Sequence, residues 1–172
     1  MSSSAEREWP VPRTPAARVV GGLFRSRNYV WDNDHRIVAE YGLSWTQFLV
    51  LMYLRGRAPH HVMSPTQLYE ATQASSGGMT KALHALVAAG HIERTANPED
   101  RRSRLVKLRP SGAQMAEVIV ERLIDTNTEM FGDILSMEEC ETLAVLLAKL
   151  SAGLQERGDR GASTVKNFDG ED

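Results

Sequence analysis

The sequence predicts a mainly α-helical protein with one small β-hairpin, and three observations indicate this fold class. Beyond the N-terminal segment, four serines are each followed three residues later by Gln or Glu, a pattern typical of helix starts, because each side chain satisfies a backbone N–H at the other position. Apolar residues recur at steps of three and four along most of the chain, as on one side of a helix. Between Gly90 and Ser111 that spacing stops, and two strand-like segments flank the turn-rich stretch Asn97-Pro98-Glu99-Asp100.

The length and composition indicate one domain, since domains commonly have about 100–200 residues and this chain has 172. Its one cysteine, Cys140, excludes an internal disulfide and is typical of a reducing cytosol. The longest apolar run is the seven residues Phe48–Leu54, whereas a membrane-spanning helix needs about 20. The first fifteen residues hold charges and prolines where a signal peptide would be apolar. We therefore expect a cytoplasmic protein without a membrane partner.

The N-terminal part predicts two helices. Residues 1–14 are expected to be flexible, and residues 15–41 form a long amphipathic helix that Gly42 ends. The apolar side of this helix consists of Val20, Leu23, Phe24, Val30, Trp31, Ile37, Val38 and Tyr41. Ser44 and Gln47 mark the start of the second helix.

Two short segments with helix starts and a hairpin follow. Ser64 with Gln67 begins the first short helix, and either Ser75 or Ser76 begins the second, which Gly90 ends. The apolar side of the second short helix consists of Met79, Leu83 and Leu86. The predicted strands of the hairpin are His91–Thr95 and Ser103–Leu108.

The last third of the chain is predicted to be helical. Ser111 with Gln114 and Ser136 with Glu139 mark two further helix starts, and apolar residues return at helical spacing as far as residue 157. Residues 158–172 have little apolar content, so we expect a flexible tail there.

The order of these elements has the plan of a winged helix-turn-helix, since two short helices joined by the turn Thr72-Gln73-Ala74 directly precede a two-stranded hairpin. Within a domain that spans residues 15–157, we assign residues 44–110 to a DNA-binding lobe. The helices over 15–41 and 111–157 are assigned to dimerisation, because their apolar sides exceed what the small lobe covers. The alternative is a monomer with a helical sub-core.

One side of the second short helix is small and polar. If Met79, Leu83 and Leu86 face the core, the residues on the opposite side lie together, because residues three and four apart are neighbours on a helix surface. Hydroxyl groups and a lysine at such a surface bond to bases or phosphates, and glycines allow close approach. The alternative is a solvated helix surface with a weak, glycine-rich start. The polar residues are Ser75, Ser76, Gly77, Thr80, Lys81 and His84.

The hairpin concentrates positive charge. Residues 91–109 hold six Lys and Arg against three Asp and Glu, whereas the whole chain has a net charge of −2. Arg101 and Arg102 at the predicted tip, with Arg104 beside them, are placed to enter a minor groove, whose negative potential attracts guanidinium groups. Asp100 is expected to hold a neighbouring guanidinium by a paired hydrogen bond. The alternative is a charged turn that only improves solubility.

The stretch SSGGMTKALHALVAAGHIERTANPEDRRSRLVKLRPSG resembles the recognition helix and wing of MarR-family transcriptional regulators. The most specific part is the tip Asp100-Arg101-Arg102, followed by Leu105-Val106-Lys107-Leu108 and a new helix start at Ser111. The resemblance extends from about residue 18 to 156. It implies a homodimer whose two winged lobes read a pseudo-palindromic operator, and many members of the family are repressors released by a small phenolic or aromatic acid. Carried over by position, it places Ser76, Gly77, Thr80 and Lys81 in the major groove and Arg102 in the minor groove.

An arginine and an aspartate interrupt the apolar side of the first helix. Arg27, Trp31 and Asp34 lie on the same stripe as Phe24, and charged groups there are costly to bury unless they are paired. One interpretation is a structural ion pair at the dimer interface. The other is a pocket for an aromatic effector, with Trp45 as a further wall.

Other chemistry has less support in the sequence. Cys140 lies near the start of the last helix, where we expect a buried, inert thiol rather than a redox switch. The five histidines follow no metal-ligand spacing, so we predict no metal site. The chain lacks a nucleophilic Ser-x-x-Lys arrangement and a Gly-rich phosphate loop, so we predict neither an enzyme nor a cofactor. The histidines are His35, His60, His61, His84 and His91.

We therefore predict a sequence-specific DNA-binding transcriptional regulator, a repressor that a small aromatic or phenolic effector releases from double-stranded DNA. Two alternatives stay open. One is a metal-sensing DNA-binding regulator, and the other is a helical protein-interaction module whose basic hairpin is incidental.

Overall fold

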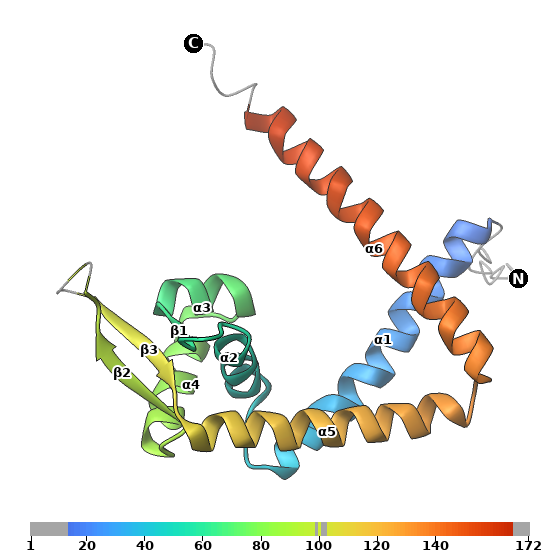
Figure 1. Cartoon of the computed structure of the whole chain (residues 1–172). Helices are drawn as coiled ribbons and strands as arrows, with labels where there is room; N and C mark the ends of the chain where they lie inside the picture. The colour runs from blue at the N-terminus through green and yellow to red at the C-terminus, as the bar shows by residue number, and fades with distance from the viewer. Residues whose placement is uncertain (1–13, 99, 101–102, 167–172) are drawn as a thin grey trace, which may run out of the picture. The chain divides into compact units, whose positions relative to one another are not determined.

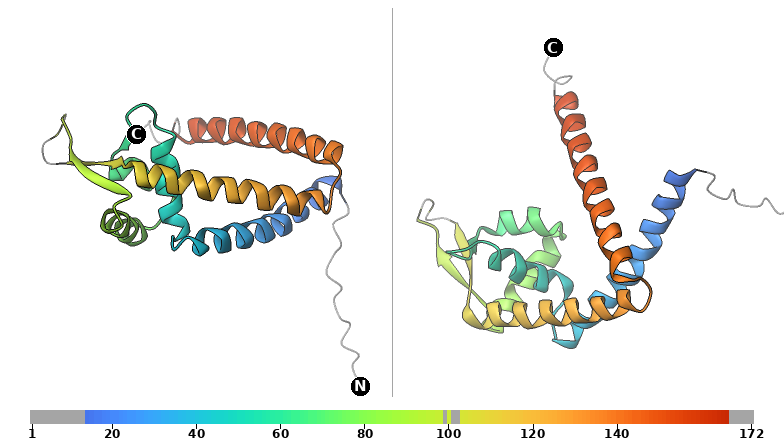
Figure 2. Two further views of the ribbon diagram at one scale, coloured as in Figure 1. Left: turned by 60° about the horizontal axis from the view of Figure 1, so that its bottom comes forward. Right: turned by 45° about the vertical axis from the view of Figure 1, so that its right-hand side comes forward.

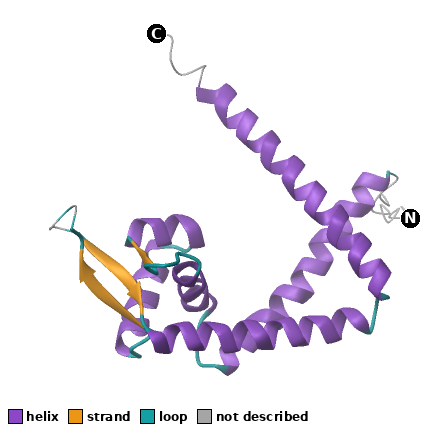
Figure 3. Ribbon diagram, viewed as in Figure 1, coloured by secondary structure: helices purple, strands orange, loops and turns teal. Residues whose placement is uncertain are grey.

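The computed structural model describes residues 14–98, 100 and 103–166, with side chains as far as residue 157. This part of the chain forms six helices and three strands (Figure 1). Figure 3 shows how far helix predominates, which confirms the predicted fold class. The chain divides into two compact units, the first ending at Ile124 and the second beginning at Asp125. In order, the elements are α1 (Pro15–Glu40), α2 (Trp45–Arg55), β1 (Val62–Met63), α3 (Pro65–Thr72), α4 (Ser76–Ala88), β2 (Ile92–Ala96), β3 (Arg104–Leu108), α5 (Pro110–Gly132) and α6 (Met137–Lys166).

Three of the four predicted capping boxes are present. Ser44 begins α2 and Ser64 begins α3, each with reciprocal hydrogen bonds to the Gln three residues later. At α6, the Ser136 N–H donates to Glu139 Oε2 at 2.9 Å, and the Glu139 N–H donates to Ser136 Oγ at 3.3 Å. Hydrogen bonds from Ser136 lower the pKa of the Glu139 carboxyl, because they favour its charged form. These caps explain why the starts of α2, α3 and α6 fall where the sequence predicts them.

The fourth predicted capping box, at Ser111, is wrong. Helix α5 begins one residue earlier, at Pro110, where a missing N–H costs nothing. The Ser111 hydroxyl instead donates to the carbonyl oxygen of Gly90 at 2.8 Å. That carbonyl lies just past the end of α4, where backbone acceptors have no partner within the helix. Ser111 therefore ties the start of α5 to the end of α4.

The sheet contains one strand in addition to the two strands of the predicted hairpin. Strands β1, β3 and β2 are adjacent in that order, and both pairs are antiparallel. β1 is only two residues long, too short to show the alternation from which a strand is predicted. It adds to the hairpin at its base, where Val62 lies opposite Lys107 and the Leu108 N–H donates to the His61 carbonyl at 3.0 Å.

The core of the first unit lies between the end of α1, helices α2 to α4, the sheet and the start of α5. Among the described residues it contains no buried polar or charged side chain. Strand β3 follows the pleat, with Val106 and Leu108 buried and Lys107 exposed between them. The largest fully buried side chains are Ile37, Leu51, Leu54, Leu68, Leu86, Ile92 and Ile119.

The second unit contains the end of α5 and the whole of α6. None of the described side chains of α6 is buried, and its leucines are well exposed, for example Leu146 at 58% and Leu154 at 60%. Cys140 is half-buried, not buried as expected. The helix continues to Lys166, so the predicted start of a flexible tail at Gly158 is wrong, because low apolar content does not by itself end a helix.

No single helix among the described residues is long and apolar enough to cross a membrane. Of the helices in the described ranges, only α1 and α2 taken together reach that length and composition, across a bend of 86°.

Gly112 lies where α5 passes close to the turn that precedes β2. A Cβ atom at this position would overlap the carbonyl oxygen of His91 and press on a methyl group of Leu108. That carbonyl cannot retreat easily, because it accepts a hydrogen bond from the Arg109 N–H at 3.0 Å.

We expect Gly112→Ala to lower the free energy of unfolding by about 1–3 kcal/mol, the usual cost of overpacking a well-filled site. Gly132→Ala in the same helix is the matched control, because a Cβ atom there meets nothing within 4 Å. Chemical denaturation of both variants measures the difference. Equal denaturation midpoints for Gly112→Ala and the wild type would contradict this close packing.

Candidate nucleic-acid interface

Helix α4 has one side in the core and one in solvent. Met79, Leu83 and Leu86 are exposed by 4% or less, and they pack with side chains of α2 and β2. The opposite side carries Ser76, Gly77, Thr80, Lys81 and His84, all of which are exposed. We call these five residues the α4 strip. The sequence therefore predicted correctly which side of α4 is buried.

The start of α4 is fixed by its cap. Ser75 is the N-cap residue, and its side chain accepts a hydrogen bond from the Gly78 N–H at 3.1 Å. This resolves the choice between Ser75 and Ser76 and leaves the Ser76 side chain on the strip. Gln73 before the cap has φ +52°, a left-handed conformation that turns the chain sharply between α3 and α4.

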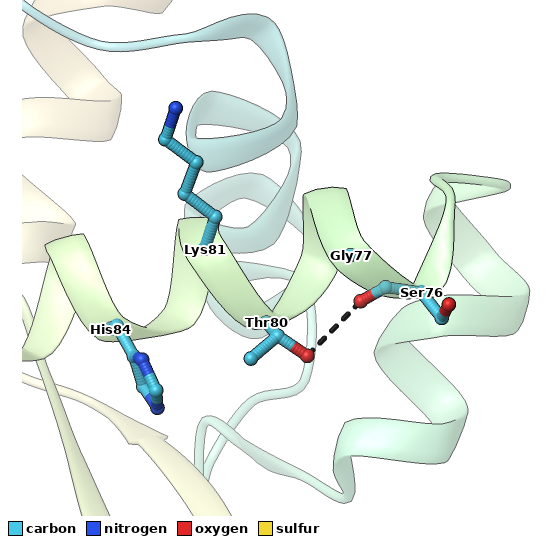
Figure 4. A pocket seen from close by; sticks show the side chains of 5 residues that line it. All are labelled: Ser76, Gly77, Thr80, Lys81 and His84. Atoms are coloured by element: carbon cyan, nitrogen blue, oxygen red, sulfur yellow. Dashed lines mark hydrogen bonds between the residues drawn. The ribbon is translucent and has the colours of Figure 1, made fainter.

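The α4 strip lines a concavity that is open to solvent (Figure 4). Within the strip, the Thr80 hydroxyl donates to the Ser76 carbonyl oxygen at 3.0 Å. Helix α4 contains no Asp or Glu, and Lys81 makes no ion pair with any residue that the structure describes. The strip is therefore rich in hydrogen-bond donors and its one ammonium group is not neutralised, which suits an anionic ligand.

The hairpin of β2 and β3 projects from the helices of the first unit (Figures 1 and 2). Its two faces differ in charge. Arg94 and Arg104 are exposed and lie on the same face as the buried Ile92, because side chains two residues apart, and those directly opposite, share a face. On the other face Glu93 lies opposite Lys107 and 4.0 Å from the Arg109 guanidinium.

A hydrogen-bonded group closes the described part of the hairpin loop. Asn97 Nδ2 donates to Ser103 Oγ at 2.8 Å, and both the hydroxyl and the N–H of Ser103 donate to the Asp100 carbonyl at 3.1 Å. Arg101 and Arg102, the residues predicted to enter the minor groove, lie outside the described residues. We did not predict these roles of Asn97 and Ser103 from the sequence. Polar residues at both ends of a predicted turn are nevertheless a signal for such a hydrogen bond.

The four residues predicted to line an effector pocket are partly brought together. The Trp31 and Trp45 ring centroids are 5.3 Å apart, and the Arg27 guanidinium lies 4.6 Å from the centre of the Trp31 ring. Asp34 is half-buried. We did not predict from the sequence that His35 belongs to this group. Its ring centroid lies 4.2 Å from that of Trp31 and 4.5 Å from that of Trp45. Its spacing of four residues from Trp31 is the signal that could have identified it.

The remaining histidines do not gather. His61 Nδ1 is bonded to the Leu54 carbonyl at 3.2 Å, His84 belongs to the α4 strip, and His91 lies in the turn after α4. Among the residues described, no three His, Cys, Asp or Glu side chains form a group that could hold a metal ion.

Two capped helices joined by a sharp turn, followed by a projecting hairpin that pairs with the short strand β1 before them, define a winged helix-turn-helix protein. Comparisons with known proteins agree. Residues 41–103 match the sequence model of the MarR family. The multiple antibiotic resistance protein MarR of Salmonella typhimurium is 34% identical over 105 residues, which cover 61% of this chain and 71% of that protein.

Two solved structures are similar over most of the chain. The structure of the multiple antibiotic resistance repressor MarR has a TM-score of 0.67 at 26% identity, with 81% of this chain and 96% of that chain covered. A crystal structure of a mutant MarR from Escherichia coli complexed with operator DNA has a TM-score of 0.59 at 29% identity, with 80% and 99% covered. The chain therefore belongs to the MarR family, whose members are transcriptional regulators with a winged-helix DNA-binding fold.

Proposed function

We propose that this protein is a cytoplasmic, homodimeric repressor that binds a pseudo-palindromic operator and is released by a small aromatic or phenolic effector. The observation that carries the proposal is the α4 strip. A helix whose apolar side is held in a core presents its other side rigidly, which recognition of base edges requires. The operator-bound relative in the same family supports DNA as the ligand.

In this proposal the α4 strip and the hairpin contact different grooves of the operator. The α4 strip and the capping residue Ser75 enter the major groove, where polar side chains reach base edges. Arg101 and Arg102 at the hairpin tip enter the adjacent minor groove, and Arg104 strengthens the positive charge behind them. Asp100 supports the tip.

The exposed apolar surface supports a homodimer. Phe24 on α1 is 67% exposed, Ile124 on α5 is 58% exposed, and α6 carries a row of exposed leucines. A row that recurs at helical spacing and is not buried within its own chain is typical of an oligomer interface. Pairing through α6 and the other long helices would set the two lobes about 34–36 Å apart, the length of one turn of DNA.

The ring cluster of Trp31, His35 and Trp45 supports an effector of the proposed class. Trp31 is 38% exposed and has the Arg27 guanidinium against its ring. An aromatic acid would stack on an indole ring, and its carboxylate would pair with a guanidinium. Release by such a ligand follows if it binds the DNA-free arrangement of the lobes more tightly than the bound one. The residues that the structure describes contain no group of three His, Cys, Asp or Glu side chains that would favour the metal-sensing alternative.

Two single variants test the DNA contacts. We expect Arg102→Ala to lower operator affinity at fixed salt by about 1–3 kcal/mol while the protein stays folded. We expect Lys81→Ala to reduce the slope of log affinity against log salt by about one unit if Lys81 contacts a phosphate. Gel-shift titrations over a range of salt concentrations measure both. Arg36→Ala, which removes the same charge from α1, is the control, and an effect as large as that of Arg102→Ala would refute the assignment of the hairpin.

The dimer is tested on α6. We expect Leu150→Glu to shift the protein towards monomer, because a carboxylate is costly to bury in an apolar interface. Ala152→Glu introduces the same charge on the opposite side of the helix and should leave the dimer intact. Sedimentation velocity at several protein concentrations distinguishes the two. A wild-type protein that sediments as a monomer would overturn the homodimer.

The effector site is tested by intrinsic fluorescence. We expect benzoate and hydroxybenzoates to quench the emission of Trp31 and Trp45 and to weaken operator binding over the same concentration range. Arg27→Ala should weaken both effects by about tenfold in ligand concentration, the value of one charge-assisted hydrogen bond. Trp31→Phe measures how much of the quenched emission comes from Trp31. Quenching without a change in DNA affinity would show that the ligand binds near these tryptophans but does not release the operator.

A further inference from the structure

Thr80 lies in the middle of the α4 strip with its hydroxyl turned inward. The hydroxyl has a single hydrogen, which it donates to the Ser76 carbonyl oxygen at 3.0 Å. Figure 4 shows the hydroxyl directed at that carbonyl and the methyl group directed away from it. Bonding of this kind selects one of the two rotamers that threonine adopts in a helix. Thr80 therefore presents a methyl group at an otherwise polar surface.

The surroundings of Thr80 leave room for a partner. Gly77 lies one turn earlier on the same strip, and a Cβ atom there would meet nothing within 4 Å. Thr80 and Gly77 both line the concavity of the strip. A methyl-sized group can therefore approach Thr80 across Gly77.

The chemistry of the strip limits which base pairs it reads directly. Paired recognition of adenine in the major groove uses the amide of Asn or Gln, and recognition of the cytosine amino group uses a carboxylate. The strip contains neither, since its side chains are hydroxyl, ammonium and imidazole groups. An A·T pair can still be read from its other base, because thymine carries a C5-methyl group that apolar atoms contact.

We infer that Thr80 is a specificity-determining residue that reads the C5-methyl group of a thymine in each half of the operator. The inference rests on the proposed function, because it requires α4 to lie in the major groove. It assigns Thr80 a contact through carbon rather than a hydrogen bond to a base or phosphate.

The experiment compares thymine with deoxyuridine, which lacks only the methyl group. Wild-type protein first selects a duplex from a random pool, and each thymine of that duplex is then replaced in turn by deoxyuridine. We expect one position in each half-site at which the replacement lowers affinity about fourfold, the value of one buried methyl group, and about 15-fold when both halves are replaced. Fluorescence anisotropy at fixed salt measures the ratio of the two dissociation constants.

Two substitutions of Thr80 separate the methyl group from the hydroxyl. Thr80→Ser keeps the hydroxyl and loses the methyl group, so the ratio between the deoxyuridine and thymine duplexes should fall to about one at that position. Thr80→Val keeps a methyl group and loses the hydroxyl, so the ratio should stay close to that of the wild type. Lys81→Ala is the control, since it should weaken both duplexes equally and leave the ratio unchanged. Thermal unfolding of each variant checks that α4 is intact.

The outcomes separate this inference from the function on which it rests. Failure to recover any duplex would overturn sequence-specific DNA binding, and the assignment of Thr80 with it. A recovered operator that is indifferent to every deoxyuridine would overturn the assignment of Thr80 alone. A Thr80→Ser variant as sensitive to deoxyuridine as the wild type would show that another residue reads the methyl group.

Discussion

The burial of one side of α4 is the constraint on which the candidate interface depends. Met79, Leu83 and Leu86 fix the rotation of the helix about its axis, because turning it would pull these side chains out of a close-packed core. The same rotation decides which residues face solvent. On a loosely packed helix, polar side chains would have no fixed direction. Here the α4 strip points in one direction because the opposite side of the helix is buried in the core.

The two ends of α4 are held in different ways. At the N-terminus the Ser75 side chain caps the helix, and at the C-terminus Ser111 of α5 bonds the carbonyl of Gly90. Gly112 then brings α5 against the His91 carbonyl, so that α5 cannot shift along its axis without disturbing the turn after α4. Helix α5 begins in the first unit and ends in the second, so these contacts fix the position of its first turn within the first unit.

Much of this arrangement could be predicted from local patterns. Capping boxes and helical spacing predicted most helix starts and the buried side of α4, because both depend on residues three or four apart. The exceptions arise from contacts between distant residues. Ser111 has the local capping pattern, but its hydroxyl donates to the carbonyl oxygen of Gly90 instead of forming a capping box. Strand β1 exists only because β3 lies beside it, and its two residues carry no pattern of their own. The contact of His35 with two tryptophans likewise needs α1 and α2 to meet first.

If the proposed homodimer forms, the exposed leucines of α6 would link the abundance of the protein to its lifetime. No described side chain of that helix is buried within its own chain, so in the proposed homodimer the helix gains its cover by mass action, and dilution removes it. Chains that are newly made or present in few copies would leave the leucines open to chaperones and proteases, which engage incompletely folded protein. Scarcity would thus shorten the survival of the regulator, and its turnover would depend on its own concentration.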